Sequence, residues 1–462
     1  MKNFRMPTAY TILFVLLILV AVATWFIPAG SYDHHEDGTP VAGSYHEVAQ
    51  NPQGPGDVIL ASFQGFYDAV DVALFILMVG GFLGVMMKTG AIDAGVSNVT
   101  RLLGGREILL IPTLMILFSL GGTSFGMWEE TMAFYPLLIP VFVSAGYDAL
   151  TGIAVVLLGS GAGVLAGTVN PFATGIASGF AGVSLGQGLV TRLVMLVVFD
   201  AVAIGYVMRY AAKVKAHPET SLVADIDRKF HVKTGGDDVP MLNGKRKVAL
   251  ILFALVFLVM IYAVIPFDEI GLPLPTLGWW FSELSGLFLV GGVLIGIIYG
   301  LGEVDTIDAF VAGAADLIGV AFIIGISRGI TVLMNAGQIT DTVLYWGEQA
   351  LEGAGSVLFI LLVFLIYLPL SILIPSSSGL ATLSIPIVAP LGQFAGVGGE
   401  LIVTAFQSAA GLVNIITPTA AVVMGGLAFG DVPYDRWVKF VWKLILIFFV
   451  LTAAFLTVSA LL

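Results

Sequence analysis

The sequence predicts an all-α integral membrane protein with about nine transmembrane helices and two re-entrant hairpins, arranged as an inverted repeat. Three observations favour this class: the hydropathy of the chain, the position of its basic residues and an internal repeat. Of the 462 residues, 58% are hydrophobic and 11% are charged, and the mean hydropathy is +1.01. Soluble domains average about 25% charged residues. We therefore expect lipid to be the main solvent of this chain.

Nine apolar stretches are close to or longer than the ~20 residues that a helix needs to cross a bilayer. The first follows Lys2 and Arg5, as the apolar part of a signal peptide would. Its Pro28-Ala29-Gly30 exit is a poor cleavage site, so we interpret it as an uncleaved first transmembrane helix. The nine expected spans cover residues 8–28, 67–88, 148–183, 189–210, 247–266, 284–301, 313–335, 400–429 and 437–461.

Two further apolar stretches, 107–146 and 357–390, are interpreted as hairpins that enter and leave the membrane on the same side. With both hairpins re-entrant, 17 of the 19 Lys and Arg fall on one side, nine of them between Arg209 and Lys247. Because Lys and Arg gather in cytoplasmic segments, that side and the N-terminus are predicted to be cytoplasmic. An eleven-span alternative would place the basic linker outside. The first arm, 107–120, measures about 21 Å as a helix, short of a ~30 Å hydrocarbon core.

The two halves of the chain resemble each other weakly. Phe63 and Phe310 are 247 residues apart, as are Pro171 and Pro418, and the same shift aligns further residues over more than 100 positions. The second span would run inward and its partner, the seventh, outward, so the repeats are predicted to be inverted. The expected divisions are a first repeat at 1–210, a cytoplasmic linker at 211–246 and a second repeat at 247–462.

Each half contains a polar hairpin tip, at 121–126 and at 375–379, followed by a helix that breaks at a proline, at 168–171 and at 414–419. Irregular backbone is tolerated at membrane depth only where it is buried in protein or lines a water-filled cavity. Interrupted segments at matching positions of inverted repeats are typical of a transporter's substrate site. The four breaks therefore predict a central binding cavity.

The candidate substrate-binding residues are polar groups at these breaks and two carboxylates that follow the first tip. They are Thr123, Ser124, Gly126, Glu129, Glu130, Asn170, Ser376, Ser377, Ser378, Asn414, Thr417 and Thr419. Hydroxyl, amide and freed carbonyl oxygens suit a hard cation such as Na⁺. The candidate Na⁺ ligands are Thr123, Ser124, Asn170, Ser377 and Thr417. Half-helix N-termini would offer positive charge to a carboxylate. The alternative is that these residues only kink and join helices.

Charged residues inside apolar segments cost roughly 2.5–3.5 kcal/mol each on insertion scales and are functional by default. Glu129 and Glu130 are candidates for a proton carrier, a Na⁺ ligand or a counter-charge for a cationic substrate; otherwise they form a pair capped by backbone donors. Arg328 either binds a substrate carboxylate or pairs with Asp200. We expect no resident cofactor, and a coupling Na⁺ or H⁺.

Several chemistries are excluded or disfavoured. The chain has no cysteine, no Gly-Lys-Ser/Thr phosphate loop and no His-Glu-x-x-His motif. An enzyme would have to depend on Glu129 and Glu130 alone. A channel is the main rival class, because re-entrant hairpins also build selectivity filters. Gly159, Gly163 and Gly167 have the spacing of small residues in close helix packing.

Four motifs resemble the YfcC-like branch of the anaerobic four-carbon dicarboxylate carrier (DcuC) family, over essentially the whole chain. They are Gly-Met-Trp-Glu-Glu-Thr at 126–131, Tyr-Pro-Leu-Leu-Ile-Pro at 135–140, Asn-Pro at 170–171 and Pro-Ser-Ser-Ser-Gly at 375–379. This resemblance implies the elevator fold of the ion transporter superfamily: a homodimer in which a scaffold domain dimerises and a mobile domain with both hairpins carries the substrate. Nine spans plus two hairpins is also the pattern of the related aminobenzoyl-glutamate transporters.

By the same resemblance, the hairpin tips and helix breaks bind substrate and Na⁺. The Ser-Asn-Thr signature of dicarboxylate/Na⁺ symporters is not present in that form, so Na⁺ and H⁺ both stay open. The family name implies dicarboxylates, whereas several YfcC-like members are described as basic amino acid antiporters. Neither hairpin has a Lys or Arg, while Glu129 and Glu130 could meet a cationic side chain, so an amino acid is favoured. The expected partners are this substrate, the lipid of a bacterial inner membrane and a second copy of the chain, without nucleic acid.

Overall fold

The computed structural model describes residues 9–34, 40–41, 43–92, 94–95, 98, 107–124, 126–184, 186–226, 241–264, 267, 273–279 and 281–462. Helices dominate these residues, beside one antiparallel strand pair, β1 (Gly30–Ser31) and β2 (His46–Glu47). Eight of the described helices are long and apolar enough to cross a membrane. The chain is therefore a multi-pass membrane protein, as predicted. Residues 227–240 of the basic linker lie outside the described residues, as do Lys2, Arg5, Arg101 and Arg106.

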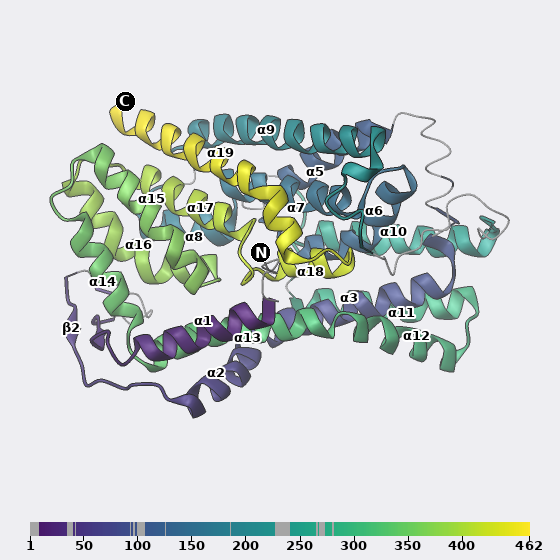
Figure 1. Cartoon of the computed structure of the whole chain (residues 1–462), viewed down its shortest axis with the longest axis horizontal. Coiled ribbons are helices and arrows are strands. Elements are labelled where there is room, and N and C mark those ends of the chain that lie inside the picture. The colour runs from purple at the N-terminus through teal and green to yellow at the C-terminus, as the bar shows by residue number, and fades with distance from the viewer. Residues whose placement is uncertain are drawn as a thin grey trace, which may run out of the picture.

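The helices form two layers (Figure 1). The long-helix layer consists of α1 (Ala9–Ala23), α2 (Pro55–Asp68), α3 (Val70–Lys88), α10 (Gly244–Val264), α11 (Phe281–Tyr299), α12 (Glu303–Asp316) and α13 (Ile318–Ala336). The hairpin layer consists of η1 (Glu107–Leu109), α5 (Leu110–Ser124), η2 (Glu129–Phe134), α6 (Tyr135–Ser144), α7 (Ala149–Ala166), η3 (Pro171–Gly175), α8 (Ile176–Phe180), α9 (Leu189–Ala216), α15 (Ser356–Leu373), α16 (Ser377–Phe394), α17 (Gly399–Asn414), α18 (Ala421–Phe429) and α19 (Tyr434–Leu461). The short helices η4 (Pro218–Thr220) and α14 (Thr340–Leu351) complete the described elements.

Small residues hold the long-helix layer together. One residue, Ala69, separates α2 from α3, and one, Leu317, separates α12 from α13. The helix α2 packs on α13, and α3 packs on α12. A Cβ on Gly65 would overlap the carbonyl oxygen of Gly325, and one on Gly84 would overlap the backbone of α12. Such close backbone approach is how membrane helices gain packing energy without a hydrophobic driving force.

The first arm of the first hairpin lies directly on α7. A Cβ on Gly159 would lie 2.9 Å from the backbone of Met115, and one on Gly163 would overlap the carbonyl oxygen of Ser119. The interpretation of Gly159 and Gly163 as packing residues is therefore confirmed. Gly167 differs, because it is the C-cap residue of α7 and has a positive φ of 27°. Positions along both helices increase together, so α5 runs parallel to α7.

The second arm runs the other way. Residues 145–148 join α6 to α7, and Ile139 of α6 packs against Gly152 of α7. This short connection makes α6 antiparallel to α7 and hence to α5. In the second hairpin, Tyr367 of α15 donates a hydrogen bond to Ser384 of α16 at 2.9 Å. Both predicted hairpins, 107–146 and 357–390, are thus reversals of the chain.

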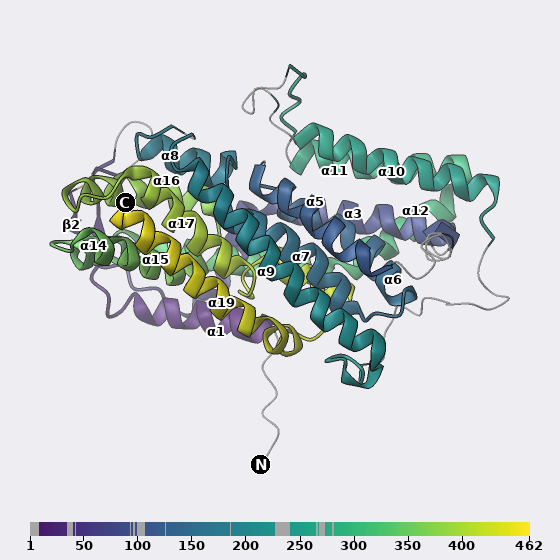
Figure 2. The same cartoon turned by 90° about the horizontal axis from the view of Figure 1, so that it is seen from above.

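The helices α9 and α19 form the outer surface of the hairpin layer, which faces the viewer in Figure 2. Predicted to end at residue 210, α9 continues to Ala216 into the expected linker. Beyond it, the Ser221 hydroxyl donates to Asp148 at 2.6 Å, and Arg436 pairs with Asp225 at 2.7 Å. The described start of the linker is therefore attached to the hairpin layer.

Candidate functional site

A polar cavity of about 160 Å³ lies between the two layers. The hairpin layer contributes Gly126, Trp128, Glu129, Glu130, Val164, Asn170, Ala173, Pro375, Ser376, Ser377, Ser378, Gln407, Ala410, Asn414, Thr419, Ala420 and Ala421. The long-helix layer contributes Val72, Phe281, Ile324, Ser327 and Arg328. Both hairpin tips and both helix breaks therefore reach one cavity, as the sequence predicts.

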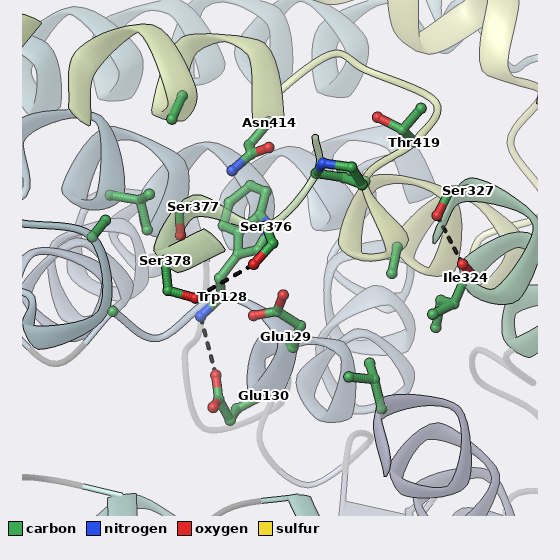
Figure 3. Close-up of a pocket in the computed structure, with 18 of the residues that line it drawn as sticks. Trp128, Glu129, Glu130, Ile324, Ser327, Ser376, Ser377, Ser378, Asn414 and Thr419 are labelled. Carbon is green, nitrogen blue, oxygen red and sulfur yellow. Dashed lines mark hydrogen bonds between the residues drawn. The ribbon is translucent and has the colours of Figure 1, made fainter. Parts of the chain in front are cut away.

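The first hairpin tip turns at Gly126, which has a φ of 76°. A Cβ at this position would lie 2.8 Å from the side-chain oxygen of Asn170, so glycine is required here. The turn brings two glutamates to the start of η2. Figure 3 shows Glu129 pointing toward the second tip, whereas Glu130 turns back and accepts a hydrogen bond from the Trp128 N–H at 3.1 Å. Both glutamates line the cavity, but only Glu129 points toward the second tip, whereas Glu130 is hydrogen-bonded to the Trp128 backbone.

Two residues predicted at this tip, Thr123 and Ser124, do not line the cavity. The hydroxyl of Thr123 accepts from the Thr168 N–H at 3.0 Å, and its carbonyl accepts from the Thr168 hydroxyl at 3.0 Å. The Ser124 hydroxyl donates to the Leu120 carbonyl at 2.5 Å. In this arrangement Thr123 joins the first hairpin to the first broken helix.

The first broken helix ends as α7 at Ala166 and resumes as the π-helical turn η3 at Pro171. Proline at 171 has no N–H, so local side chains replace some of the lost helical hydrogen bonds. The side-chain oxygen of Asn170 accepts from the Ala173 N–H at 3.3 Å, and the Thr174 hydroxyl donates to the Gly167 carbonyl at 2.8 Å. These bonds hold Asn170 in the cavity wall.

The second hairpin tip presents the N-terminus of α16 to the cavity. Ser376 caps this helix: its hydroxyl accepts from the Gly379 N–H at 3.2 Å and lies 3.4 Å from the Ser378 hydroxyl. The first N–H groups of a helix have no intrahelical partner and carry partial positive charge. With the Ser377 hydroxyl beside them, they form a surface suited to an anionic group.

At the second helix break, Asn414 and Thr419 line the cavity, whereas Thr417 does not. The hydroxyls of Thr417 and Thr419 lie 2.8 Å apart. The two carbonyls before Thr417 accept hydrogen bonds from α19, from the Tyr434 hydroxyl at 2.6 Å and the Trp437 indole at 3.0 Å. Protein groups thus satisfy the carbonyls that the break frees.

Of the five candidate Na⁺ ligands, Asn170 and Ser377 line the cavity, while Thr123, Ser124 and Thr417 are hydrogen-bonded within the protein. Among the described residues, no three acidic or histidine side chains form a cluster that could hold a metal ion.

Arg328 reaches the cavity from α13, on the wall opposite the hairpins. It acts electrostatically on Glu129, as does Asp71. No ion pair among the described residues includes Arg328 or Asp200. Asp200 instead accepts a hydrogen bond from the Ser119 hydroxyl at 2.9 Å. The suggested pairing of Arg328 with Asp200 is therefore wrong, and Arg328 is placed where it could bind a substrate carboxylate.

Among the polar and aromatic side chains of the cavity, the sequence did not identify Trp128, Phe281, Ser327 and Gln407. Gln407 donates from its side-chain nitrogen to the carbonyl of Val164, and its buried side-chain oxygen has no hydrogen-bond partner among the residues that the structure describes. Because the carbonyl fixes the orientation of the amide, this oxygen is available only as an acceptor. The only amide in the stretch 401–413, whose other polar side chains are the hydroxyls of Thr404 and Ser408, was a usable signal for this residue.

A multi-pass helical protein with a charged cavity enclosed between two helix layers has the architecture of a membrane carrier. The family profile "DcuC: C4-dicarboxylate anaerobic carrier" matches residues 6–461. The chain belongs to this DcuC family. It is a transporter and not an enzyme.

Two relatives match nearly the whole chain. An "Uncharacterized protein" of Haemophilus influenzae (strain ATCC 51907 / DSM 11121 / KW20 / Rd) is 33% identical, covering 96% of this chain and 95% of the relative. YfcC of Escherichia coli (strain K12), provisionally named a basic amino acid antiporter, is 32% identical, covering 95% of this chain and 93% of the relative.

Two solved structures are similar at lower identity. The YdaH transporter of Alcanivorax borkumensis aligns over 98% of both chains, with a TM-score of 0.45 and 16% identity. MtrF of Neisseria gonorrhoeae, described with a class of antimetabolite efflux pumps, aligns over 98% of this chain and 95% of its own, with a TM-score of 0.42 and 17% identity.

Proposed function

We propose that this protein is a secondary active transporter, coupled to an ion or to exchange, for a small amino acid with a cationic side chain. The observation that carries this proposal is the separation of charge in the cavity. On the hairpin side of the cavity, Glu129 offers an acceptor and the N-terminus of α16 offers donors, while Arg328 offers donors from the opposite wall. An amino acid has a carboxylate at one end and, when basic, a cation at the other. The name of the YfcC relative supports the same class of substrate.

A four-carbon dicarboxylate is the second candidate. The family description favours it, and the cavity has two features that attract anions, Arg328 and the N-terminus of α16. In this case Glu129 would serve the coupling cation instead of the substrate. The attraction of a dicarboxylate to these two donor sites would then have to exceed its repulsion by the Glu129 carboxylate.

For the mechanism we propose an elevator, in which the hairpin layer carries the cavity across the membrane against the long-helix layer. The position of the cavity between the layers supports this idea. Hydrogen bonds tie elements within the hairpin layer to one another, such as Thr123 to Thr168 and Gln407 to Val164. Across the cavity, the facing wall is mostly apolar, with Val72, Phe281 and Ile324 among its five residues. Such a surface allows sliding at low cost.

The proposed fold has nine spans and two re-entrant hairpins in an inverted repeat. Matched helix lengths support the repeat: 14 residues in both α2 and α12, 19 in both α3 and α13, and 28 in both α9 and α19. We further propose a homodimer in a bacterial inner membrane, with a cytoplasmic N-terminus, and Na⁺ or H⁺ as the coupling ion. The clustering of Lys and Arg supports this orientation.

Uptake into proteoliposomes tests the substrate class. With arginine, lysine, succinate and fumarate as probes, we expect saturable uptake of arginine and lysine and counterflow by preloaded substrate. Imposed Na⁺ and pH gradients identify the coupling ion. Uptake of succinate alone would favour the dicarboxylate alternative. A flux that does not saturate and shows no counterflow would contradict a carrier and indicate a channel.

A further inference from the structure

A carboxyl group outside the substrate cavity lies partly buried in the hairpin layer. Asp200 is in α9, between the apolar stretches 193–199 and 201–205. The helix is among those long and apolar enough to cross the membrane. The Ser119 hydroxyl of α5 donates to Asp200 at 2.9 Å. Ionised carboxylates are costly at this depth, and a group without a counter-charge tends to remain neutral.

The surroundings of Asp200 provide no counter-charge in the described part of the chain. The elements that pack on α9 are η1, α5, α7, η4 and α19. Over their whole lengths, α5 and α7 contain no titratable side chain. The titratable side chains of η1 and η4 are Glu107 and Glu219, which lie nearer the C-terminal end of α9. The titratable side chains of α19 all lie in its first ten residues: Tyr434, Asp435, Arg436, Lys439 and Lys443. On α9 itself, the neighbouring titratable groups are Arg192, two turns before Asp200, and Tyr206.

Several of these groups already have other partners. Glu107 pairs with Lys215 at 3.0 Å, and Arg436 pairs with Asp225 at 2.7 Å. The Tyr206 hydroxyl donates to the Phe440 carbonyl at 2.5 Å. No ion pair among the described residues involves Asp200. Among the described residues, the carboxyl group therefore has a hydroxyl as its hydrogen-bond partner and no cation paired with it.

We propose that Asp200 and Ser119 form a proton-binding site in the hairpin layer, apart from the substrate cavity, through which a proton gradient drives transport. This inference rests on the proposed ion-coupled transport and names the ion as H⁺ and its carrier as Asp200. The proton is exchanged with water on either side of the membrane, so no covalent step or further reactant is needed.

The contacts of α5 connect this site to the cavity. Ser119 precedes Thr123 by four residues, one helical turn, so both lie on the same side of α5. Thr123 bonds to Thr168 at the first helix break, beside Asn170 in the cavity wall. Loss of the proton would leave a negatively charged Asp200 carboxylate that accepts the hydrogen bond from Ser119. The stronger hydrogen bond to Ser119 would then shift α5, and α5 would transmit this shift to the first hairpin tip.

Infrared spectroscopy tests the proton site without any substrate. Near neutral pH, we expect the C=O band of a protonated carboxylic acid in the wild type. The band should persist in a Glu129→Gln, Glu130→Gln double variant and be lost when Asp200→Asn is added. Retention of the whole band after Asp200→Asn would overturn the proposal, whatever the substrate proves to be.

Transport tests the coupling. In proteoliposomes with arginine, Asp200→Asn should lose the accumulation driven by a pH gradient and retain counterflow, because asparagine mimics the protonated form. Asp200→Glu should restore part of the driven accumulation, and Ser119→Ala should weaken it. The matched control is Asp308→Asn, at an exposed position of α12. Driven accumulation that is unchanged in Asp200→Asn would contradict the coupling, whereas absence of arginine transport in the wild type would contradict the proposed substrate instead.

Discussion

Replacement of Glu129 by glutamine is expected to abolish the preference of the transporter for arginine over citrulline. Citrulline has nearly the same shape as arginine, but its side chain is neutral. A hydrogen bond to a charged group contributes about 1.5–3 kcal/mol, which corresponds to roughly a 10- to 150-fold change in Kd. In Glu129→Gln, we expect the Kd of arginine to rise by this factor and that of citrulline to change little. Competition binding to purified protein measures both values.

Two variants serve as controls for this result. Glu130→Gln should have the smaller effect, because Glu130 is turned toward the Trp128 backbone. Glu303→Gln, at an exposed position of α12, should have none. If Glu129→Gln still prefers arginine over citrulline as the wild type does, Glu129 is not the counter-charge of the substrate side chain.

Replacement of Arg328 by glutamine is expected to abolish the preference for arginine over agmatine, which has the same cationic side chain but no carboxylate. Arg328 lies on the cavity wall without an ion-pair partner among the described residues, so its guanidinium is available to a substrate. Arg328→Lys should recover part of the preference, because lysine keeps the charge but loses the bidentate geometry. Relative kcat/KM values for the two compounds give the loss directly.

The matched control for this change is Arg209→Gln, at an exposed position of α9. Equal rejection of agmatine by Arg328→Gln and the wild type would contradict the role of Arg328. It would leave the N-terminus of α16 as the binding site of the carboxylate. Loss of succinate uptake in the same variant, without any effect on arginine, would favour the dicarboxylate alternative.

The sequence predicted the architecture of the cavity better than its individual contacts. Glycine and proline determine backbone geometry directly, so both hairpins and both helix breaks could be located from composition. Gly126 illustrates this point, because its positive φ and its contact with Asn170 follow from the turn itself. The sequence also placed Glu129, Asn170 and Ser376 correctly at the cavity.

Side-chain direction was less predictable. Thr123, Ser124 and Thr417 belong to polar segments, but their hydroxyls are hydrogen-bonded to other protein groups and do not line the cavity. A polar segment does not specify which of its hydroxyls points inward. Arg328 and Asp200 show the same limitation over a longer range, because each lies in a different layer and only tertiary packing determines its neighbours.

The central claim is that the cavity between the two layers carries the substrate and opens to either side of the membrane. Because the chain has no cysteine, a Ser377→Cys variant would carry a single thiol at the second hairpin tip. We measure its modification by a membrane-impermeant maleimide in right-side-out and in inside-out vesicles. If the cavity opens to either side, the thiol is labelled from both sides, and labelling is slower when arginine is present. Labelling from one side only under all conditions, or a rate that arginine does not change, would contradict this claim.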